Sequence, residues 1–211
     1  PDEQKAPLKA DDLFVDVGGS SSEAVEKMGI RVGDPMVPHA ELLPLAGNTL
    51  MGKAFDDRAG CAVLIRVLET LSRDRPDFTL LACFSVCEEV GLRGAKTAAF
   101  QVQPTVALAL EGTVAADLPG TPKHKNPTLM GQGPAVTVAD RSIIVHPKLA
   151  RFIRQTARDL KIPWQIKTPG YGATDAGAIH LSGAGVLTGV ISIPCRYIHS
   201  PNIVMNLDDF E

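Results

Sequence analysis

The sequence predicts an α/β fold, with a mainly parallel β-sheet and helices on both of its faces. Two observations support this fold class. Short runs that are apolar at nearly every position, such as 77–86 and 105–110, are typical of strands buried on both faces of a sheet. Segments with helical spacing of apolar residues lie between such runs, and this alternation favours parallel strands joined by helices.

The elements after residue 56 are expected in a regular order. A mostly buried helix should follow Asp57 and run through Arg73, because its apolar residues recur at helical spacing. Pro147 suits the first turn of a later amphipathic helix. The other expected elements are strands at 77–86, 105–110, 135–145, 164–168 and 185–194, and helices at 91–100, 146–162 and 174–182.

Residues 1–38 differ from the rest of the chain in their predicted secondary structure. Strand-like runs at 13–19 and 30–37 flank a helical stretch at 21–29, so we expect the end of a separate β-rich domain. Residues 39–211 should then form the α/β domain without its N-terminal part. The sequence opens on Pro1 and closes on an acid-rich stretch typical of a first helical turn, which predicts a chain truncated at both ends.

Composition and charge narrow the class of protein. The 211 residues are 45% hydrophobic, enough for one good core, and the net charge of −3 is spread along the chain. This charge predicts no nucleic-acid-binding face, and no apolar run reaches membrane-spanning length. The cysteines lack the spacing of a zinc site or a disulfide framework, which predicts reduced thiols in a cytoplasmic protein; they are Cys61, Cys83, Cys87 and Cys195.

Acidic residues and one histidine fall where predicted strands end and helices begin. In an open α/β sheet the carboxyl ends of the strands border the ligand-binding crevice, so these side chains should meet at one edge. Close carboxylates repel one another unless a cation or a shared proton compensates them. Carboxylate and imidazole groups suit zinc, manganese or cobalt, and a bridging aspartate suits a two-metal site. The residues are Asp56, Asp57, Glu88, Glu89, Glu111 and His199.

Each of these residues also has an ordinary explanation. An aspartate at a helix start caps backbone N–H groups, a glutamate pair is usually solvated, and a lone histidine is usually a hydrogen-bonded loop residue. Their combination favours the metal site. Glu88 and Glu89 are adjacent, so on an extended strand end they would point in opposite directions. One of them could then bind metal while the other faces the attacking water as a general base.

Six segments together resemble the glutamyl (deblocking) aminopeptidases, a dinuclear metallopeptidase family whose members form tetrahedral dodecamers and include relatives labelled endoglucanase. The resemblance implies a zinc-aminopeptidase-like fold, two divalent ions (zinc or cobalt, or else manganese), short peptides as substrates, N-terminal residues as products and a homo-oligomer. Residues 1–38 would be the remnant of an inserted oligomerisation domain. The segments are MGKAFDDRAGCAVLI, CEEVGLRGAKTAAF, ALEGTVAADLPGTP, GQGPAVTVADRSI, GYGATDAGAIHL and ISIPCRYIHSP.

The resemblance also implies a role for each site residue. Asp56 matches the aspartate that bridges both metals, and Glu88 matches the general base. Glu89 and His199 match ligands of one metal, and Glu111 matches a ligand of the other. The residue after the bridging aspartate, Asp57 here, follows a cis peptide bond in the family.

One part of the family pattern is missing from this sequence. Family members carry an earlier HxDE-type segment that supplies another histidine ligand. The remaining histidines match no ligand position, so the printed sequence lacks a complete second metal site; they are His39, His124, His146 and His180.

Two questions stay open at the level of sequence. The loop GYGATDAGAIH is expected to shape the pocket for the first substrate side chain through Tyr171, Gly172 and Asp175, unless it is a plain connection capped by Thr174 or Asp175. A glycosidase that uses paired carboxylates is a rival interpretation. Sugar-binding grooves are usually lined by aromatic side chains, however, and only 5% of the residues are aromatic. A non-catalytic assembly or regulatory fragment is the other rival.

Overall fold

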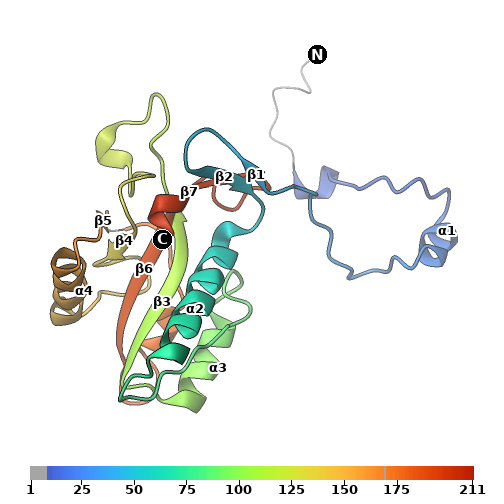
Figure 1. Ribbon diagram of the computed structural model, residues 1–211. Helices are drawn as coiled ribbons and strands as arrows, with labels where there is room; N and C mark the ends of the chain where they lie inside the picture. The colour runs from blue at the N-terminus through green and yellow to red at the C-terminus, as the bar shows by residue number, and fades with distance from the viewer. Residues whose placement is uncertain (1–8, 169) are drawn as a thin grey trace. The chain divides into compact units, whose positions relative to one another are not determined.

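The computed structural model of this chain describes residues 9–168 and 170–211. The chain separates into two compact units, Pro1–Pro38 and His39–Glu211. Each unit is described by itself below, with the element labels of Figure 1. No helix in the described part of the chain combines the length and the apolar character needed to cross a membrane.

The first unit contains the short helices η2 (Ala10–Asp12) and α1 (Ser22–Lys27). The helix expected at 21–29 is confirmed, and Ser21 caps it by accepting a hydrogen bond from the Ala24 N–H group at 3.2 Å. The strands expected at 13–19 and 30–37 are wrong, because the described residues of this unit contain no strand. An apolar run becomes a strand only when its backbone groups find partners.

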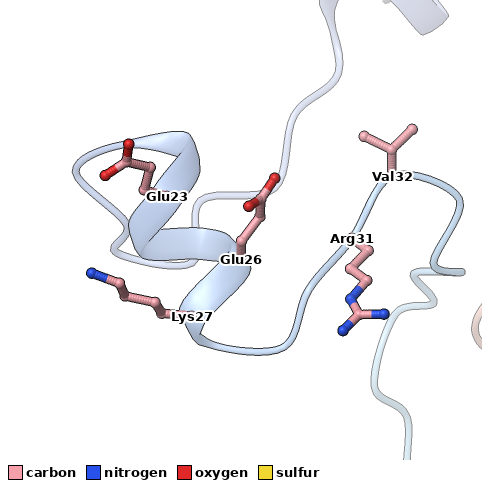
Figure 2. A pocket seen from close by; sticks show the side chains of 5 residues that line it. All are labelled: Glu23, Glu26, Lys27, Arg31 and Val32. Carbon is pink, nitrogen blue, oxygen red and sulfur yellow. The ribbon is translucent and has the colours of Figure 1, made fainter.

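An open hollow lies beside α1 in the first unit (Figure 2). Its lining side chains are all exposed and include charges of both signs, and Figure 2 shows three of them on the helix itself. Mixed charges on an exposed face are typical of solvated surface, so we assign this hollow no chemistry. The lining residues are Glu23, Glu26, Lys27, Arg31 and Val32.

The second unit is built on a seven-stranded sheet with the order β1-β2-β7-β6-β4-β5, in which β3 pairs with the other edge of β6. The longest pairing, β3 with β6, is parallel through all nine residues of β3, and β4 with β5 is also parallel. The remaining pairs are antiparallel. The strands are β1 (Leu43–Pro44), β2 (Thr49–Gly52), β3 (Val106–Val114), β4 (Ala135–Thr137), β5 (Gln165–Lys167), β6 (Leu187–Arg196) and β7 (Ile203–Asn206).

Helices cover both faces of this sheet, which confirms the predicted α/β class. Val190 of β6 packs with Ala150 and Ala176, whereas Cys195 of β6 packs with Ala59. Residues an odd number apart on a strand point to opposite faces, so α4 and α5 lie on one face and α2 on the other (Figure 1). The helices are α2 (Phe55–Arg73), α3 (Arg93–Val102), α4 (Pro147–Asp159), α5 (Ala176–Ile179), η3 (Lys123–Lys125) and η4 (Leu207–Asp209).

The strand predicted at 77–86 is wrong. These residues form no strand, and Phe78, Leu81, Phe84 and Val86 are exposed. Within the described residues β3 pairs with β6 alone, so no further strand lies along its free edge. The apolar composition of 77–86 was typical of a central strand, but composition does not supply the neighbouring backbone that a strand requires.

Candidate metal centre

Asp56 and Asp57 lie at the start of α2, where the helix is interrupted. Both residues have non-helical backbone angles, and the peptide bond between them is cis, as the resemblance implied. The Asp57 Oδ1 atom accepts a hydrogen bond from the Gly60 N–H group at 3.1 Å, so Asp57 performs the helix capping. A Cβ atom at position 60 would lie 2.4 Å from the Asp57 carboxylate, so this approach requires glycine. The carboxylate of Asp56 takes no part in the cap.

The turn that carries Glu88 and Glu89 is fixed by the start of α3. The Gly94 N–H group donates to the Val86 carbonyl at 2.9 Å. The Leu92 N–H group donates to the Glu88 carbonyl at 3.0 Å. A Cβ atom at position 94 would lie 2.4 Å from the Val86 oxygen, so only glycine permits this contact. These bonds hold both glutamates in place although no strand precedes them.

The first group of potential metal ligands joins three elements. His199, in the turn between β6 and β7, places its Nε2 atom 3.1 Å from Asp56 Oδ2 and 3.4 Å from Glu89 Oε2. His199 has a φ of 65°, a left-handed conformation that is uncommon outside glycine and concentrates at functional sites. The ligand atoms of Asp56, Glu89 and His199 lie within 4.8 Å of one another.

A second group shares Asp56 with the first. The ligand atoms of Asp56, Asp57 and Glu111 also lie within 4.8 Å of one another. Glu111 lies on β3 with 7% of its surface exposed, and its Oε1 atom accepts a hydrogen bond from the Asp175 N–H group at 3.2 Å. Asp56 therefore belongs to two sets of ligand atoms, as a bridging ligand must.

The acids of this centre are crowded, and several of them repel one another. Burial raises the pKa of Asp57 to about 7, and that of Glu111 to about 9, and neighbouring carboxylates raise both further than burial alone. Burial, with repulsion from Glu89 foremost among its neighbours, also raises the pKa of Glu88 to about 7. Oxygen donors and one imidazole at these separations suit divalent cations, which would remove the repulsion. The residues present therefore fit metal ions.

Glu88 belongs to neither group of ligands, although it is half-buried beside them. Burial is the largest cause of its raised pKa, followed by the charges of Glu89, Asp175 and Asp56, and Glu88 in turn raises the pKa of Asp57 and of Glu111, so its carboxylate lies near members of both groups. Glu88 and Glu111 thus approach the same centre, although the strand expected before Glu88 is absent. The four other histidines take part in neither group within the described residues.

The loop before α5 contributes Asp175 to this centre. Asp175 occupies the capping position of α5, yet its side chain makes no cap; its Oδ2 atom accepts a short hydrogen bond from the Ser85 hydroxyl instead. Tyr171 and Gly172 are exposed, and the Tyr171 hydroxyl donates to the Lys125 carbonyl at 3.4 Å. The alternative of a side-chain cap from Asp175 is therefore wrong.

Sequence reasoning missed two polar groups near the centre, Ser85 and Lys167, and it assigned Asp57 no ligand role of its own. Asp57 was expected to follow the bridging aspartate but not to offer a ligand atom of its own. Ser85 is part of an apolar run, and Lys167 is part of a three-residue strand, so neither position carried a periodic or motif signal. Only the folded chain brings them close to the acids.

The M42 glutamyl aminopeptidase family matches residues 1–211. The chain belongs to this family. A solved aminopeptidase from the archaeon Desulfurococcus kamchatkensis is 44% identical with a TM-score of 0.95, and the match covers 100% of this chain and 59% of that one. The TET1 peptidase of Pyrococcus horikoshii, described as assembling into a tetrahedron or an octahedral shell, is 29% identical with a TM-score of 0.79, over 92% of this chain and 56% of that one.

Names within the family cover substrates of opposite charge. A relative from Pyrococcus furiosus, named lysyl aminopeptidase, is 34% identical over 94% of this chain and 56% of its own length. This chain thus spans less than two thirds of the length of each of these relatives. Family membership leaves the preferred first residue of the substrate open.

The raised pKa values predict how the metal-free protein responds to pH. A carboxyl whose folded pKa lies above its unfolded value binds more protons in the folded state, so it favours folding at low pH and loses this contribution as pH rises. For Asp57, Glu88 and Glu111 this stabilising contribution is complete below the unfolded pKa values of 3.8 to 4.5. It is lost as the pH rises through the folded pKa, which is about 7 for Asp57 and Glu88 and about 9 for Glu111. With a chelator present, we expect a lower Tm at about pH 8.5 than at about pH 6, a difference that zinc should diminish.

Glu111→Gln should reduce this pH dependence, whereas Glu69→Gln, an exposed acid on α2, should leave it unchanged. Differential scanning calorimetry at both pH values provides the measurement. A metal-free Tm that rises between about pH 6 and about pH 8.5 would show that these acids are not crowded and buried as described.

Proposed function

We propose that the full-length gene product containing this chain is a metal-dependent aminopeptidase that releases N-terminal residues from short peptides. The observation that supports this function best is the pair of ligand groups that share Asp56, with Glu88 beside both and part of neither. Membership of the M42 glutamyl aminopeptidase family supports the same reaction.

Two divalent ions, zinc or cobalt with manganese as an alternative, would be held by the two groups. Asp56, Glu89 and His199 form one set of ligands. Asp56 and Glu111 belong to the other, with Asp57 in reach. When bound, such ions act as Lewis acids that polarise a carbonyl group and lower the pKa of a water molecule.

The chain's own residues would carry the proton transfers. Glu88 accepts a proton from the attacking water and passes it to the leaving amine, the task of a general base that then acts as a general acid. Its position outside both ligand groups leaves its carboxylate available for this task.

The neighbouring loop would bind the first residue of the substrate. Asp175 is tied to the centre through its N–H bond to Glu111, so a side chain bound along this loop would sit directly beside the reacting groups. Tyr171 and Gly172 are exposed on the same loop and would shape the pocket.

We also propose that the protein is a homo-oligomer and is located in the cytoplasm. The Pyrococcus horikoshii relative forms large shells, which supports a homo-oligomer, with a dodecamer as the expected state. Residues 1–38 would be the end of an inserted oligomerisation domain, and several apolar residues of this unit, Phe14 and Met36 among them, are exposed. All four cysteines are free, in keeping with the cytoplasmic location expected from their spacing.

The rival functions have less support. A glycosidase needs two acids placed across a sugar ring, in a groove usually lined by aromatic side chains. Here two carboxylates meet one imidazole, and one of the two also meets two further carboxylates. The ring of Trp164 lies instead against the Arg158 guanidinium at 5.5 Å. The chain by itself could be inactive, because neither ligand group contains the second histidine that the resemblance implies.

Metal titration tests this proposal. The chain of residues 1–211 should bind roughly one divalent ion tightly through Asp56, Glu89 and His199, and a second one weakly, because a typical site uses three or four protein ligands including histidine. Isothermal titration with zinc measures the stoichiometry. His199→Ala should abolish the tight site, whereas His124→Ala, an exposed histidine outside both groups, should not.

Two outcomes would contradict the proposal. Two tightly bound ions per chain of residues 1–211 would show that the assignment of ligands to one tight and one weak site is wrong. A metal-loaded full-length gene product that hydrolyses no aminoacyl chromogenic substrate would exclude the aminopeptidase function itself.

A further inference from the structure

Arg196 and Asp117 form a two-point ion pair between the end of β6 and the segment that follows β3. The Arg196 Nε atom donates to Asp117 Oδ1 at 2.7 Å, and its Nη2 atom donates to Asp117 Oδ2 at 2.9 Å. Asp117 Oδ2 also accepts a hydrogen bond from the Met130 N–H group at 3.2 Å. Although burial raises the pKa of Asp117, these hydrogen bonds lower it overall, so the pair is charged at neutral pH.

The segment that contacts Asp117 is itself anchored. Asp209 has only 2% of its surface exposed, and its carboxylate accepts hydrogen bonds from the Gly131 and Gly133 N–H groups, both at 2.6 Å. Met130 precedes these glycines, so its bond to Asp117 comes from a segment that is held on its other side as well. The ion pair therefore ties Arg196 to a fixed part of the domain.

Arg196 is the residue from which the turn that carries His199 begins. The pairing of β6 with β7 closes at Arg196 and Val204, and residues 197–202 form the connection. Tyr197 and His199 both have left-handed backbone angles, with φ values of 57° and 65°. The Ser200 N–H group donates to the Tyr197 carbonyl at 3.1 Å. The path of this turn thus depends on the direction in which Arg196 leaves the sheet.

The His199 side chain has little else to orient it. Its side chain is 65% exposed, and its Nε2 atom faces the carboxylates of Asp56 and Glu89. Within residues 9–168 and 170–211 no hydrogen bond fixes its Nδ1 atom, whereas a metal-ligating histidine usually donates its second ring nitrogen to an orienting group. The orientation of this imidazole therefore depends on the backbone of its turn.

The same ion pair reaches the strand of the second ligand group. Asp117 follows β3, which carries Glu111. Backbone bonding between β3 and β6 extends as far as the Ala115 N–H group, which donates to the Cys195 carbonyl at 2.8 Å. The side chains of Asp117 and Arg196 join the two chain segments beyond this bond. The pair thus links the strand of Glu111 to the turn that follows β6.

We infer that Asp117 and Arg196 are positioning residues that fix the turn of His199 and thereby set the metal affinity of its ligand group. This inference rests on the proposed metal-dependent function, and neither residue belongs to a ligand group itself. Without the ion pair, metal binding must also order the turn, and the entropy lost in that ordering weakens binding.

Competition titration with a chelator measures zinc affinity in the full-length gene product. Arg196→Met should lower the affinity for one of the two bound ions by about 10- to 100-fold, the usual effect of losing a group that orients a ligand. Arg196→Lys should lose affinity as well, but less, because an ammonium group keeps the charge without the two-point contact. Arg66→Met, which breaks the exposed ion pair with Glu69 on α2, should leave both affinities unchanged.

A double variant tests whether the two residues act as one unit. Asp117→Asn keeps the shape of the side chain and the acceptor for the Met130 N–H group, but it removes the charge. If Asp117 acts through Arg196, the double variant Asp117→Asn with Arg196→Met should bind zinc no more weakly than Arg196→Met alone. Losses that simply add would show that the residues act separately and would contradict a joint positioning role.

Spectroscopy and thermal unfolding separate positioning from a structural role. The visible absorption of bound cobalt depends on the arrangement of its ligands, so cobalt-loaded Arg196→Met should differ in spectrum from the wild-type protein. A purely structural pair would lower the Tm of the metal-free protein, with wild-type zinc affinity and cobalt spectrum in the folded variant. That result would overturn the inference. Arg196→Lys allows the same comparison if Arg196→Met does not fold.

Failure of the proposed function would look different. A wild-type full-length protein that binds no divalent ion contradicts the metal-dependent function, and the inference with it. A wild-type protein that binds two ions, with the same affinities in every folded Arg196 and Asp117 variant, contradicts the inference alone.

Discussion

Glu88→Gln in the full-length gene product should leave folding and metal content intact, while turnover falls by roughly 10²- to 10⁴-fold, the usual contribution of a positioned acid–base group. Glutamine keeps the shape of the side chain but cannot accept the proton. Glu88 belongs to neither ligand group, so its replacement removes no ligand atom. Steady-state kinetics and metal analysis of the same preparation provide the measurement.

Glu89→Gln should produce a different defect. Glu89 offers a ligand atom to the group with Asp56 and His199, and an amide is a weaker ligand than a carboxylate. Metal affinity should therefore fall by roughly tenfold or more, and added metal should restore part of the activity. Added metal should not restore Glu88→Gln, because that variant lacks a base rather than an ion.

An exposed acid of α2 supplies the matched control. Glu69 makes a surface ion pair with Arg66 at 3.0 Å, so Glu69→Gln should change stability by less than about 0.5 kcal/mol and leave the rate unaltered. If Glu88→Gln and Glu89→Gln behave like this control, both are ordinary surface acids. If they lose metal equally, the division between base and ligand is wrong.

Helical periodicity predicted the helices well, because an apolar stripe is a local property of the sequence. The helix from Asp57 to Arg73 and the helix beginning at Pro147 both occur where expected. Fully apolar runs also identified β3 and β6, which pair side by side in the sheet. Strands β1, β2 and β7, of two to four residues, were not predicted.

The run at 77–86 shows the limit of this reasoning. Its composition is as apolar as that of β3, yet it forms no strand in the structure. Whether an apolar run becomes a strand depends on backbone partners that are distant in sequence, and no local signal reports them. The glutamates that follow it are nevertheless placed, because bonds to the start of α3 fix their turn.

The candidate site was predictable where its residues share motifs and unpredictable where distant segments meet. Asp56, Glu89, Glu111 and His199 all stood out because they lie where predicted strands end or a predicted helix begins. The contact between Ser85 and Asp175 joins positions 90 residues apart, and the burial of Lys167 depends on how a loop folds over it. Neither depends on a pattern that the sequence displays.

Asp56→Asn should be the most damaging single change for metal binding. Asp56 is the one residue that both ligand groups contain in the described structure, so the substitution weakens both at once. Changes to residues that merely orient a ligand reduce metal affinity by about 10- to 100-fold, and loss of a shared anionic ligand should exceed that range. Zinc retained after dialysis should fall towards zero, and activity should fall with it.

Asp57→Asn is the matched comparison, one residue away. Asparagine can still accept the hydrogen bond from the Gly60 N–H group, so the start of α2 should remain folded. Asp57 contributes no atom to the group of Asp56, Glu89 and His199, so the ion held there should be retained. Equal metal loss in the two variants would show that a general disturbance of the helix start is responsible. Retention of both ions in Asp56→Asn would show that Asp56 bridges nothing, and the two-metal proposal would then lose its central ligand.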